Sequence, residues 1–94
     1  MPDYLAVVHV MLKKSILDPQ GRAVETTLRR LGHTNLSHLR IGKRIELTLS
    51  GERAAVEAQV AEIATKVLSN PVMEEVEYQL TELAGPDLGG GSDG

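Results

Sequence analysis

Cysteine is absent from this chain of 94 residues. Its absence excludes a disulfide framework and any metal site built on thiolates. Phenylalanine and tryptophan are also absent, and two tyrosines are the only aromatic residues. Because readers of single-stranded nucleic acid stack bases on aromatic side chains, the composition argues against such a module. The net charge of −3 likewise gives no overall basic balance for nucleic acid or an anionic membrane.

Long apolar runs are missing as well. No stretch approaches the roughly 20 apolar residues that span a bilayer, and the first residues, Met-Pro-Asp-Tyr, do not resemble a signal peptide. We therefore expect a cytoplasmic protein that does not contact a membrane. Hydrophobic residues make up 41% of the chain, which suits a folded protein. A domain this small has a thin core, and oligomerisation is a common remedy.

The chain is expected to form one domain over residues 1–84, followed by a flexible Gly-rich tail over residues 85–94. Apolar and β-branched residues predict a strand over residues 4–13. Both faces of this strand are largely apolar, which favours a cover on its second face, and a partner subunit could supply it.

A helix is predicted to follow the first strand. Asp18 is a favoured N-cap, Pro19 suits the first helical position, and Gly32 is a natural stop. The same helix start could hold an anion through its free amides. Capping of those amides by the Asp18 carboxylate is the competing interpretation, because it would repel an anion.

Apolar residues fall at alternate positions over residues 36–49. Two interpretations are open for this region. One is a hairpin turn at Gly42 and Lys43, and the other is one long strand bent at Gly42. The alternation favours the long strand, which could leave the sheet of one subunit and enter that of its partner.

The second half of the chain is predicted to contain a helix over residues 51–69 and a strand over residues 72–83. Asn70 and Pro71 end the helix, because Asn tolerates a left-handed conformation and Pro blocks continuation. The fold class is therefore α+β with the order β-α-β(β)-α-β. We expect two helices packed on one face of an antiparallel sheet, in a segment-swapped dimer formed through the long central strand.

Signatures of catalysis are weak throughout the sequence. The three histidines show no metal-ligand spacing, no Gly-x-Ser-x-Gly occurs, and the glycines form no phosphate loop. We therefore expect no catalytic residue and no metal. Arg40, Lys43 and Arg44 cluster around Gly42, where they form either a solvated sheet edge or a contact surface for an acidic partner.

Three segments, in this order and spacing, resemble the PurS family. Residues 14–24 read Lys-Ser-Ile-Leu-Asp-Pro-Gln-Gly-Arg-Ala-Val, residues 40–43 read Arg-Ile-Gly-Lys, and residues 68–72 read Leu-Ser-Asn-Pro-Val. The similarity extends from residue 4 to residue 83. Nine positions match the family pattern as partner-contact or structural residues: Asp18, Pro19, Gln20, Gly21, Arg40, Gly42, Lys43, Asn70 and Pro71.

The resemblance implies the non-catalytic small subunit of phosphoribosylformylglycinamidine (FGAM) synthase, a glutamine-dependent, ATP-using ligase of purine biosynthesis. In such a complex a PurQ-type glutaminase releases ammonia, and a PurL-type synthetase binds ATP, Mg²⁺ and substrate. The small subunit bridges the two and supports ammonia transfer, binds no cofactor itself, and forms homodimers or homotetramers.

Two other classes share this element order. A ferredoxin-like small-molecule-binding regulatory domain would place a glycine loop directly after the first strand, where Lys-Ser-Ile-Leu intervenes at residues 14–17. A stand-alone acylphosphatase-like enzyme would need an anion loop, and Asp18 is poorly placed for one.

Overall fold

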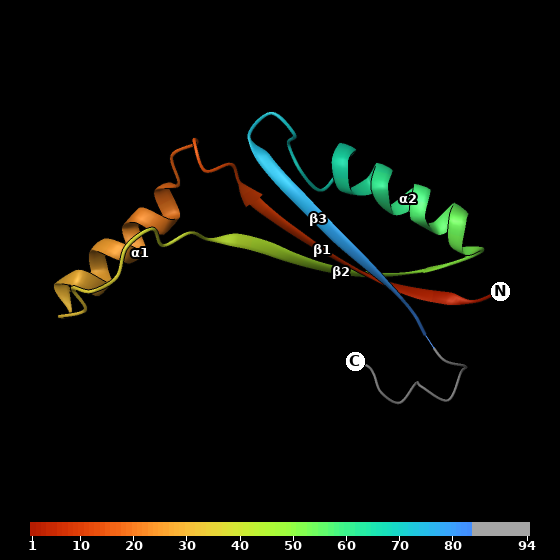
Figure 1. The fold of residues 1–94 in the computed structure, drawn as a ribbon, viewed down its shortest axis with the longest axis horizontal. Helices are drawn as coiled ribbons and strands as arrows, with labels where there is room; N and C mark the ends of the chain where they lie inside the picture. The colour runs from red at the N-terminus through yellow and green to blue at the C-terminus, as the bar shows by residue number, and fades with distance from the viewer. Residues whose placement is uncertain (84–94) are drawn as a thin grey trace.

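The computed structural model describes residues 1–83, so the predicted tail at residues 85–94 lies outside the described part of the chain. Three strands and two helices alternate along these residues (Figure 1). Their bounds are β1 Asp3–Leu12, α1 Pro19–Arg30, β2 Gly42–Ser50, α2 Arg53–Lys66 and β3 Glu74–Glu82. This arrangement confirms the α+β class and the five expected elements.

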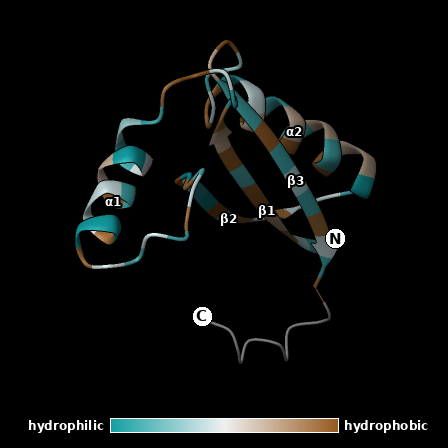
Figure 2. Cartoon of the chain, turned by 60° about the vertical axis from the view of Figure 1, so that its left-hand side comes forward, coloured by the Kyte–Doolittle hydropathy of each residue, from teal (hydrophilic) through white to brown (hydrophobic). Residues whose placement is uncertain are grey.

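The strands form one antiparallel sheet with the order β2-β1-β3. The apolar strand β1 lies in the centre, with Ala6 opposite Leu47 of β2 and Leu80 of β3. Its central position explains its composition, because a strand with neighbours on both edges contributes to the core along its length (Figure 2). Strands β2 and β3 are the two edges of the sheet within the described chain.

The hydrophobic core lies between one face of the sheet and α2. Alternate residues of β1 are buried on this face, and Val56, Val60 and Ala64 of α2 pack against them. These buried β1 side chains are Tyr4, Ala6, Val8 and Val10. On the opposite face Leu5, Val7 and Met11 are only partly buried, and no helix in residues 1–83 covers them. A partner that covers this face stays a prediction.

Helix α1 has the predicted caps. The Asp18 side chain accepts from the Gly21 amide, and Pro19 occupies the first turn. At the other end the amides of Gly32 and His33 donate to the carbonyls of Arg29 and Leu28, which is the Schellman arrangement with a left-handed glycine at φ 105°. The start and the end of α1 are therefore set by local sequence.

Packing of both helices on one face of a sheet stays a prediction for the segment-swapped dimer, because a single chain places only one helix there. Only α2 packs on the sheet, against β1 and β3, whereas α1 lies away from it (Figure 1). Helix α1 runs beside the segment that returns to β2, and we call residues 13–41 the α1 arm. The apolar side of α1 is left exposed: Val24 is 40% exposed and Leu31 is 70% exposed.

The region around Gly42 also differs from expectation. No hairpin forms there, and β2 begins at Gly42, so the long strand over residues 36–49 is too long by its first half. The reason is where the backbone amides of Leu39 and Ile41 donate. Their acceptors are the carboxylates of Glu25 and Asp18, not the carbonyls of a neighbouring strand.

Candidate functional site

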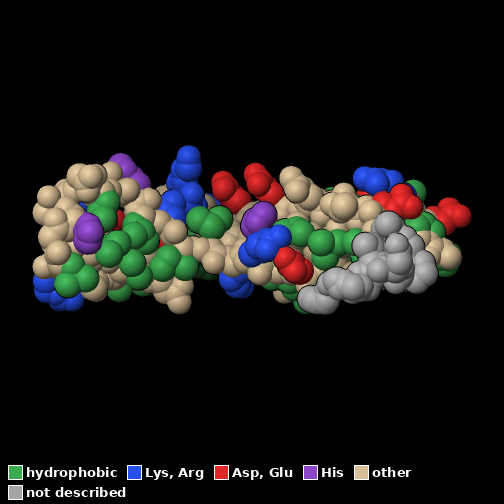
Figure 3. Space-filling view, turned by 90° about the horizontal axis from the view of Figure 1, so that it is seen from below, with side chains coloured by type: hydrophobic (Ala, Val, Ile, Leu, Met, Phe, Trp, Pro, Cys, Tyr) green, Lys and Arg blue, Asp and Glu red, His purple; other side chains and the backbone are tan. Residues whose placement is uncertain are grey.

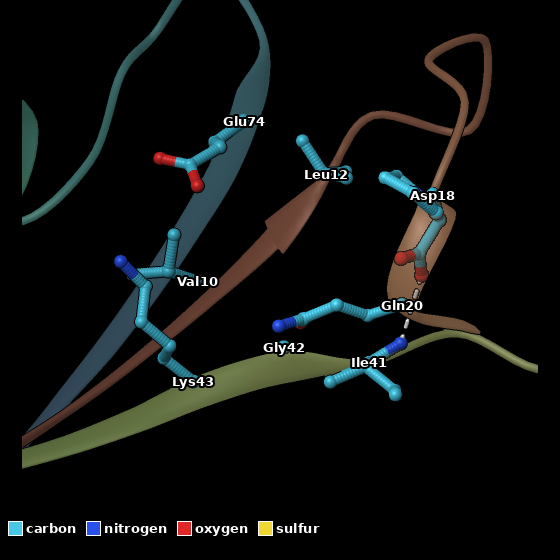
Figure 4. A pocket seen from close by; sticks show the side chains of 9 residues that line it. Val10, Leu12, Asp18, Gln20, Ile41, Gly42, Lys43 and Glu74 are labelled. Atoms are coloured by element: carbon cyan, nitrogen blue, oxygen red, sulfur yellow. Dashed lines mark hydrogen bonds between the residues drawn. The ribbon is translucent and has the colours of Figure 1, made fainter. Parts of the chain in front are cut away.

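A groove of about 480 Å³ opens where the α1 arm leaves the sheet (Figure 4). It lies beside the end of β1, the start of β2 and the start of α1, and β3 contributes one side chain. The lining residues are Val10, Leu12, Asp18, Pro19, Gln20, Ile41, Gly42, Lys43 and Glu74. Three segments far apart in the sequence thus meet here, and five of the nine family-pattern positions are among their residues.

Asp18 connects two of these segments. Its Oδ1 accepts from the Gly21 amide at 2.9 Å, and its Oδ2 accepts from the Ile41 amide at 3.0 Å. One carboxylate therefore caps α1 and fixes the return segment beside it. This double use accounts for Asp18 as a structural residue, and it confirms the capping interpretation over an anion at the helix start.

Gly21 lies where the backbones of α1 and the return segment come closest. An added Cβ would lie 2.6 Å from the carbonyl oxygen of Leu39 and 2.6 Å from Oδ2 of Asp18. Any larger residue would therefore force the two segments apart. Gly21 is buried and takes no part in lining the groove.

Arg40 attaches the α1 arm to β1, and Glu25 joins two segments within the arm. Arg40 donates to the carbonyl of Leu12 at the end of β1, and Glu25 accepts from the Leu39 amide at 3.3 Å. Glu25 also pairs with Arg29 at 3.0 Å. The hydrogen bond from Arg40 thus connects the arm to the end of β1, whereas apolar packing holds α2 on the sheet.

Lys43 and Gln20 present the free polar groups of the groove. The Gln20 side chain reaches from α1 into the groove, and Lys43 extends from β2 on the same side as Glu74 (Figure 4). The Glu74 carboxylate is already engaged, because its Oε1 accepts from the Asn70 amide at 2.7 Å. Lys43 has no ion-pair partner within residues 1–83.

Asn70 and Pro71 form the turn from α2 into β3. The Asn70 Oδ1 accepts from the Val72 amide at 3.0 Å, and its carbonyl accepts from the Glu74 amide at 2.7 Å. Neither residue lines the groove. Asn70 is connected to the groove only through its contact with Glu74. We therefore interpret Asn70 and Pro71 as structural positions of the family pattern.

We call the region where the α1 arm meets the sheet the junction. The sequence analysis did not identify two of its residues, Glu25 and Glu74. Glu25 lies seven residues after Asp18, which is two helical turns, so both carboxylates project from the same side of α1. That spacing could have predicted that another segment of the chain lies along this side of α1. No such signal pointed to Glu74, because its place depends on the pairing of β3 with β1.

The electrostatics of the junction follow from these hydrogen bonds. The Gly21 and Ile41 amides hold the pKa of the Asp18 carboxyl below its ordinary value of 3.8. The hydrogen bond from Arg29, followed by that from the Leu39 amide, lowers the pKa of Glu25. A carboxylate stabilised in this way supports the fold above the pKa of the unfolded chain, and that support is lost as pH falls through the folded value.

The lowered pKa of Asp18 leads to a prediction of how the stability of Asp18→Asn depends on pH. Asparagine caps helices about as well as aspartate but does not titrate. Between pH 6 and pH 3 the urea midpoint of the variant should therefore fall less than that of the wild type. The fall that the variant still shows would come from Glu25 and other carboxyl groups. Denaturation curves at four pH values would measure it. An equal fall in both proteins would mean that folding leaves the Asp18 pKa unchanged.

The described residues bring no three metal-ligating side chains together, and none of their helices is both long and apolar enough to cross a bilayer. The polar groups at the junction mainly hold backbone in place. The arrangement consists of a corner in the chain with a groove beside it, a lysine (Lys43) with no ion-pair partner among residues 1–83, and helix α1, which projects from the sheet.

Comparison with known proteins identifies the family. Residues 5–82 match the family model "PurS: Phosphoribosylformylglycinamidine (FGAM) synthase". The chain is similar to the phosphoribosylformylglycinamidine synthase subunit PurS of Mycobacterium leprae, at 49% identity over 74% of this chain and 86% of that protein. It is also similar to the same subunit of Bacillus subtilis, at 38% identity over 85% of this chain and 95% of that protein.

Solved structures give the same result. B. subtilis PurS in its C2 crystal form matches with a TM-score of 0.78 at 38% identity, over 84% of this chain and 99% of that chain. A chain of the structure of PurLQS from Thermotoga maritima matches with a TM-score of 0.73 at 31% identity, over 88% of this chain and all of that chain. Since the family model covers nearly all of the described residues, this chain belongs to the PurS family.

Proposed function

We propose that this chain is the small subunit of FGAM synthase in purine biosynthesis. The family match over residues 5–82 carries the proposal, because the matched relatives are named as the PurS subunit of that enzyme. The likeness to a chain of the T. maritima PurLQS structure supports an assembly with PurL-type and PurQ-type subunits.

Within that assembly the chain acts in the cytoplasm as a bridge between the glutaminase and the synthetase, and it supports ammonia transfer. ATP, Mg²⁺ and glutamine are used by the larger subunits, and this chain contributes no catalytic residue. The chemistry of the junction supports this role. The carboxylates of Asp18 and Glu25 accept from backbone amides, and no nucleophile paired with a base was found among the sequence motifs.

The chain also works as an oligomer in which two copies exchange their α1 arms. Helix α1 has an apolar side, formed by Val24, Leu28 and Leu31, with no sheet to cover within one chain. Strand β2 has apolar residues, Ile45 and Leu47, which stay partly exposed because α2 packs on β1 and β3. Placing α1 of one copy on the sheet of the other gives each sheet two helices on one face and covers both apolar surfaces. A pairing of such dimers would give the tetramer.

Reconstitution tests the function. Purified PurL-type and PurQ-type subunits should form FGAM from glutamine only when this chain is added. With ammonium chloride as the nitrogen source, the requirement for this chain should be much weaker, since no ammonia then passes between subunits. Full glutamine-dependent activity without this chain would refute the proposed function. The chain alone, with ATP, Mg²⁺ and substrate, serves as the blank.

A further inference from the structure

The sheet has a second face, opposite α2, that no helix of residues 1–83 covers. Residues that pair directly across neighbouring antiparallel strands have their side chains on the same face, so the register gives its composition. Strand β1 contributes four side chains: Leu5, Val7 and Met11 are partly buried, and His9 is exposed. We call this surface, with its neighbours on β2 and β3, the open face. A mainly apolar row therefore runs along its middle.

The charges beside this row differ between its two sides. On β2 the open face has Arg44 and Glu46, which form an exposed ion pair at 2.7 Å. On β3 it has Glu75 and Glu77, which are exposed and form no ion pair within residues 1–83. Arg44 and Glu77 are both paired with His9, so they lie level with each other on opposite sides of the row. Figure 3 views the molecule from the side away from α2 and shows a histidine near the middle, with basic and acidic side chains beside it.

Exchange of the α1 arms leaves the open face uncovered. In the exchanged dimer both helices lie on the face that holds the hydrophobic core, which is formed by the other set of alternating side chains. The row of Leu5, Val7 and Met11 therefore still contacts water after the arms have been exchanged. Sheets with one apolar face commonly bury it against a second sheet, with the strands of the two sheets nearly aligned.

We propose that the open faces of two copies pack on each other and so join two exchanged dimers. The inference rests on the exchanged dimer of the proposed function, and it adds the surface and the orientation of the pairing. A two-fold axis between the two sheets can run along the strands or across them. An axis along the strands places β2 of each copy over β3 of the other. An axis across the strands places β2 over β2 and β3 over β3.

Charge selects the axis along the strands. In that orientation Arg44 of each copy faces Glu77 of the other copy, and the contact is made twice. With the axis across the strands, the two β3 strands would meet and bring their unpaired Glu75 and Glu77 side chains together. Like charges across an interface disfavour that orientation.

The polar positions level with Val7 match in the same orientation. Glu46 of one copy lies over Gln79 of the other, where the side-chain amide can donate to the carboxylate. Leu5 and Val7 of the two copies then pack on one another between these polar rows. The pairing thus covers the apolar row and gives each charged group at its centre a polar partner.

Charge reversal at one position tests the contact. Arg44→Glu and Glu77→Arg each bring like charges together twice in the paired faces. At about 30 mM salt the association constant for pairing two dimers should fall by about tenfold or more in either variant. Addition of about 0.5 M salt should bring the variants closer to the wild type, because exposed charges are then screened. Sedimentation and native mass spectrometry measure the pairing, with circular dichroism as the check of folding.

Combining both changes in one chain gives the decisive result. The double variant Arg44→Glu with Glu77→Arg exchanges the two charges, so opposite charges face each other again and pairing should return to within a few-fold of the wild type. Glu82→Arg is the matched control, because it makes the same change on β3 with the side chain on the face of Tyr4. It should pair like the wild type.

Several results would overturn the proposal. They are a wild-type chain that stays dimeric at high concentration, single variants that pair as tightly as the wild type at low salt, and a double variant that pairs no better than either single one. Single variants that dissociate to monomers would also overturn it, since the charges would then act inside the exchanged dimer.

The same variants separate this inference from the proposed function. Pairing of dimers is measured without the larger subunits, so its outcome does not depend on synthase activity. The reconstitution described above tests the function without reference to the open face. An Arg44→Glu chain that pairs like the wild type but no longer supports the synthase would assign the open face to a larger subunit, and would overturn the proposal while leaving the proposed function in place.

Discussion

Replacing Gly42 with alanine is expected to lower the free energy of unfolding by about 3 kcal/mol. That is a large share of the roughly 5–14 kcal/mol available to a chain of this length. An added Cβ would collide with Sδ of Met11 and lie 2.5 Å from the carbonyl oxygen of Val10. The thioether can move aside, but the Val10 carbonyl belongs to the central strand. The start of β2 must therefore shift away from β1, which disrupts the Met11–Gly42 pair. Urea denaturation would measure the loss.

Two further variants identify the cause. Gly32→Ala has no atom within 4 Å of the new Cβ, so it should cost only about 1 kcal/mol for its left-handed conformation. Removing the flexible obstacle, in the double variant Met11→Ala with Gly42→Ala, should not rescue stability, since the backbone carbonyl is still in place. Rescue by Met11→Ala would show that side-chain crowding, not backbone approach, makes glycine necessary at residue 42.

The features predicted well from sequence are those set by neighbouring residues. Asp18, Pro19 and Gly32 act within one turn of a helix end, so capping rules alone located both ends of α1. The strand predicted over residues 72–83 matches β3, in which Glu74, Val76 and Leu80 are partly buried on one face because successive side chains of a strand point to opposite faces. Local chemistry was sufficient in each case.

The features predicted poorly depend on partners distant in sequence. Alternation over residues 36–49 indicated a single long strand, but the amides of Leu39 and Ile41 found side-chain acceptors on α1 instead. The helix predicted over residues 51–69 ends at Lys66, and Val67 just after it is 74% exposed because the chain turns there. The position of α1 off its own sheet has no signature in its own residues, which are amphipathic in either place.

Within the candidate site, the reason for glycine at residues 21 and 42 also depends on contacts distant in sequence. Both were named from the family pattern, and neither has a positive φ that would have explained it. Their reason is contact across the fold, between α1 and the return segment for Gly21 and between β1 and β2 for Gly42. The pattern thus marked the right residues, but only the assembled junction separates those that hold backbone together from Gln20 and Lys43, which are free to meet a partner.

The variant Val24→Asp should abolish exchange of the α1 arms while leaving the single-chain fold in place. Val24 is 40% exposed in one chain, so a carboxylate there stays hydrated before assembly. In the exchanged dimer it would be buried against apolar residues, at a cost of several kcal/mol. The dissociation constant of the dimer should rise by at least about a hundredfold, and sedimentation at several concentrations would measure it.

Thr26→Asp is the matched control for this variant. Residues 24 and 26 are 200° apart around the helix, so the control adds the same charge to the opposite side of α1. Thr26 is exposed, and the variant should keep wild-type association to within a few-fold. Val24→Asp should also lose support of the synthase if the exchanged dimer is the working form, whereas Thr26→Asp should retain it. Dimers of Val24→Asp with unchanged affinity would show that α1 does not enter the partner's apolar surface, and equal losses in both variants would point to charge alone.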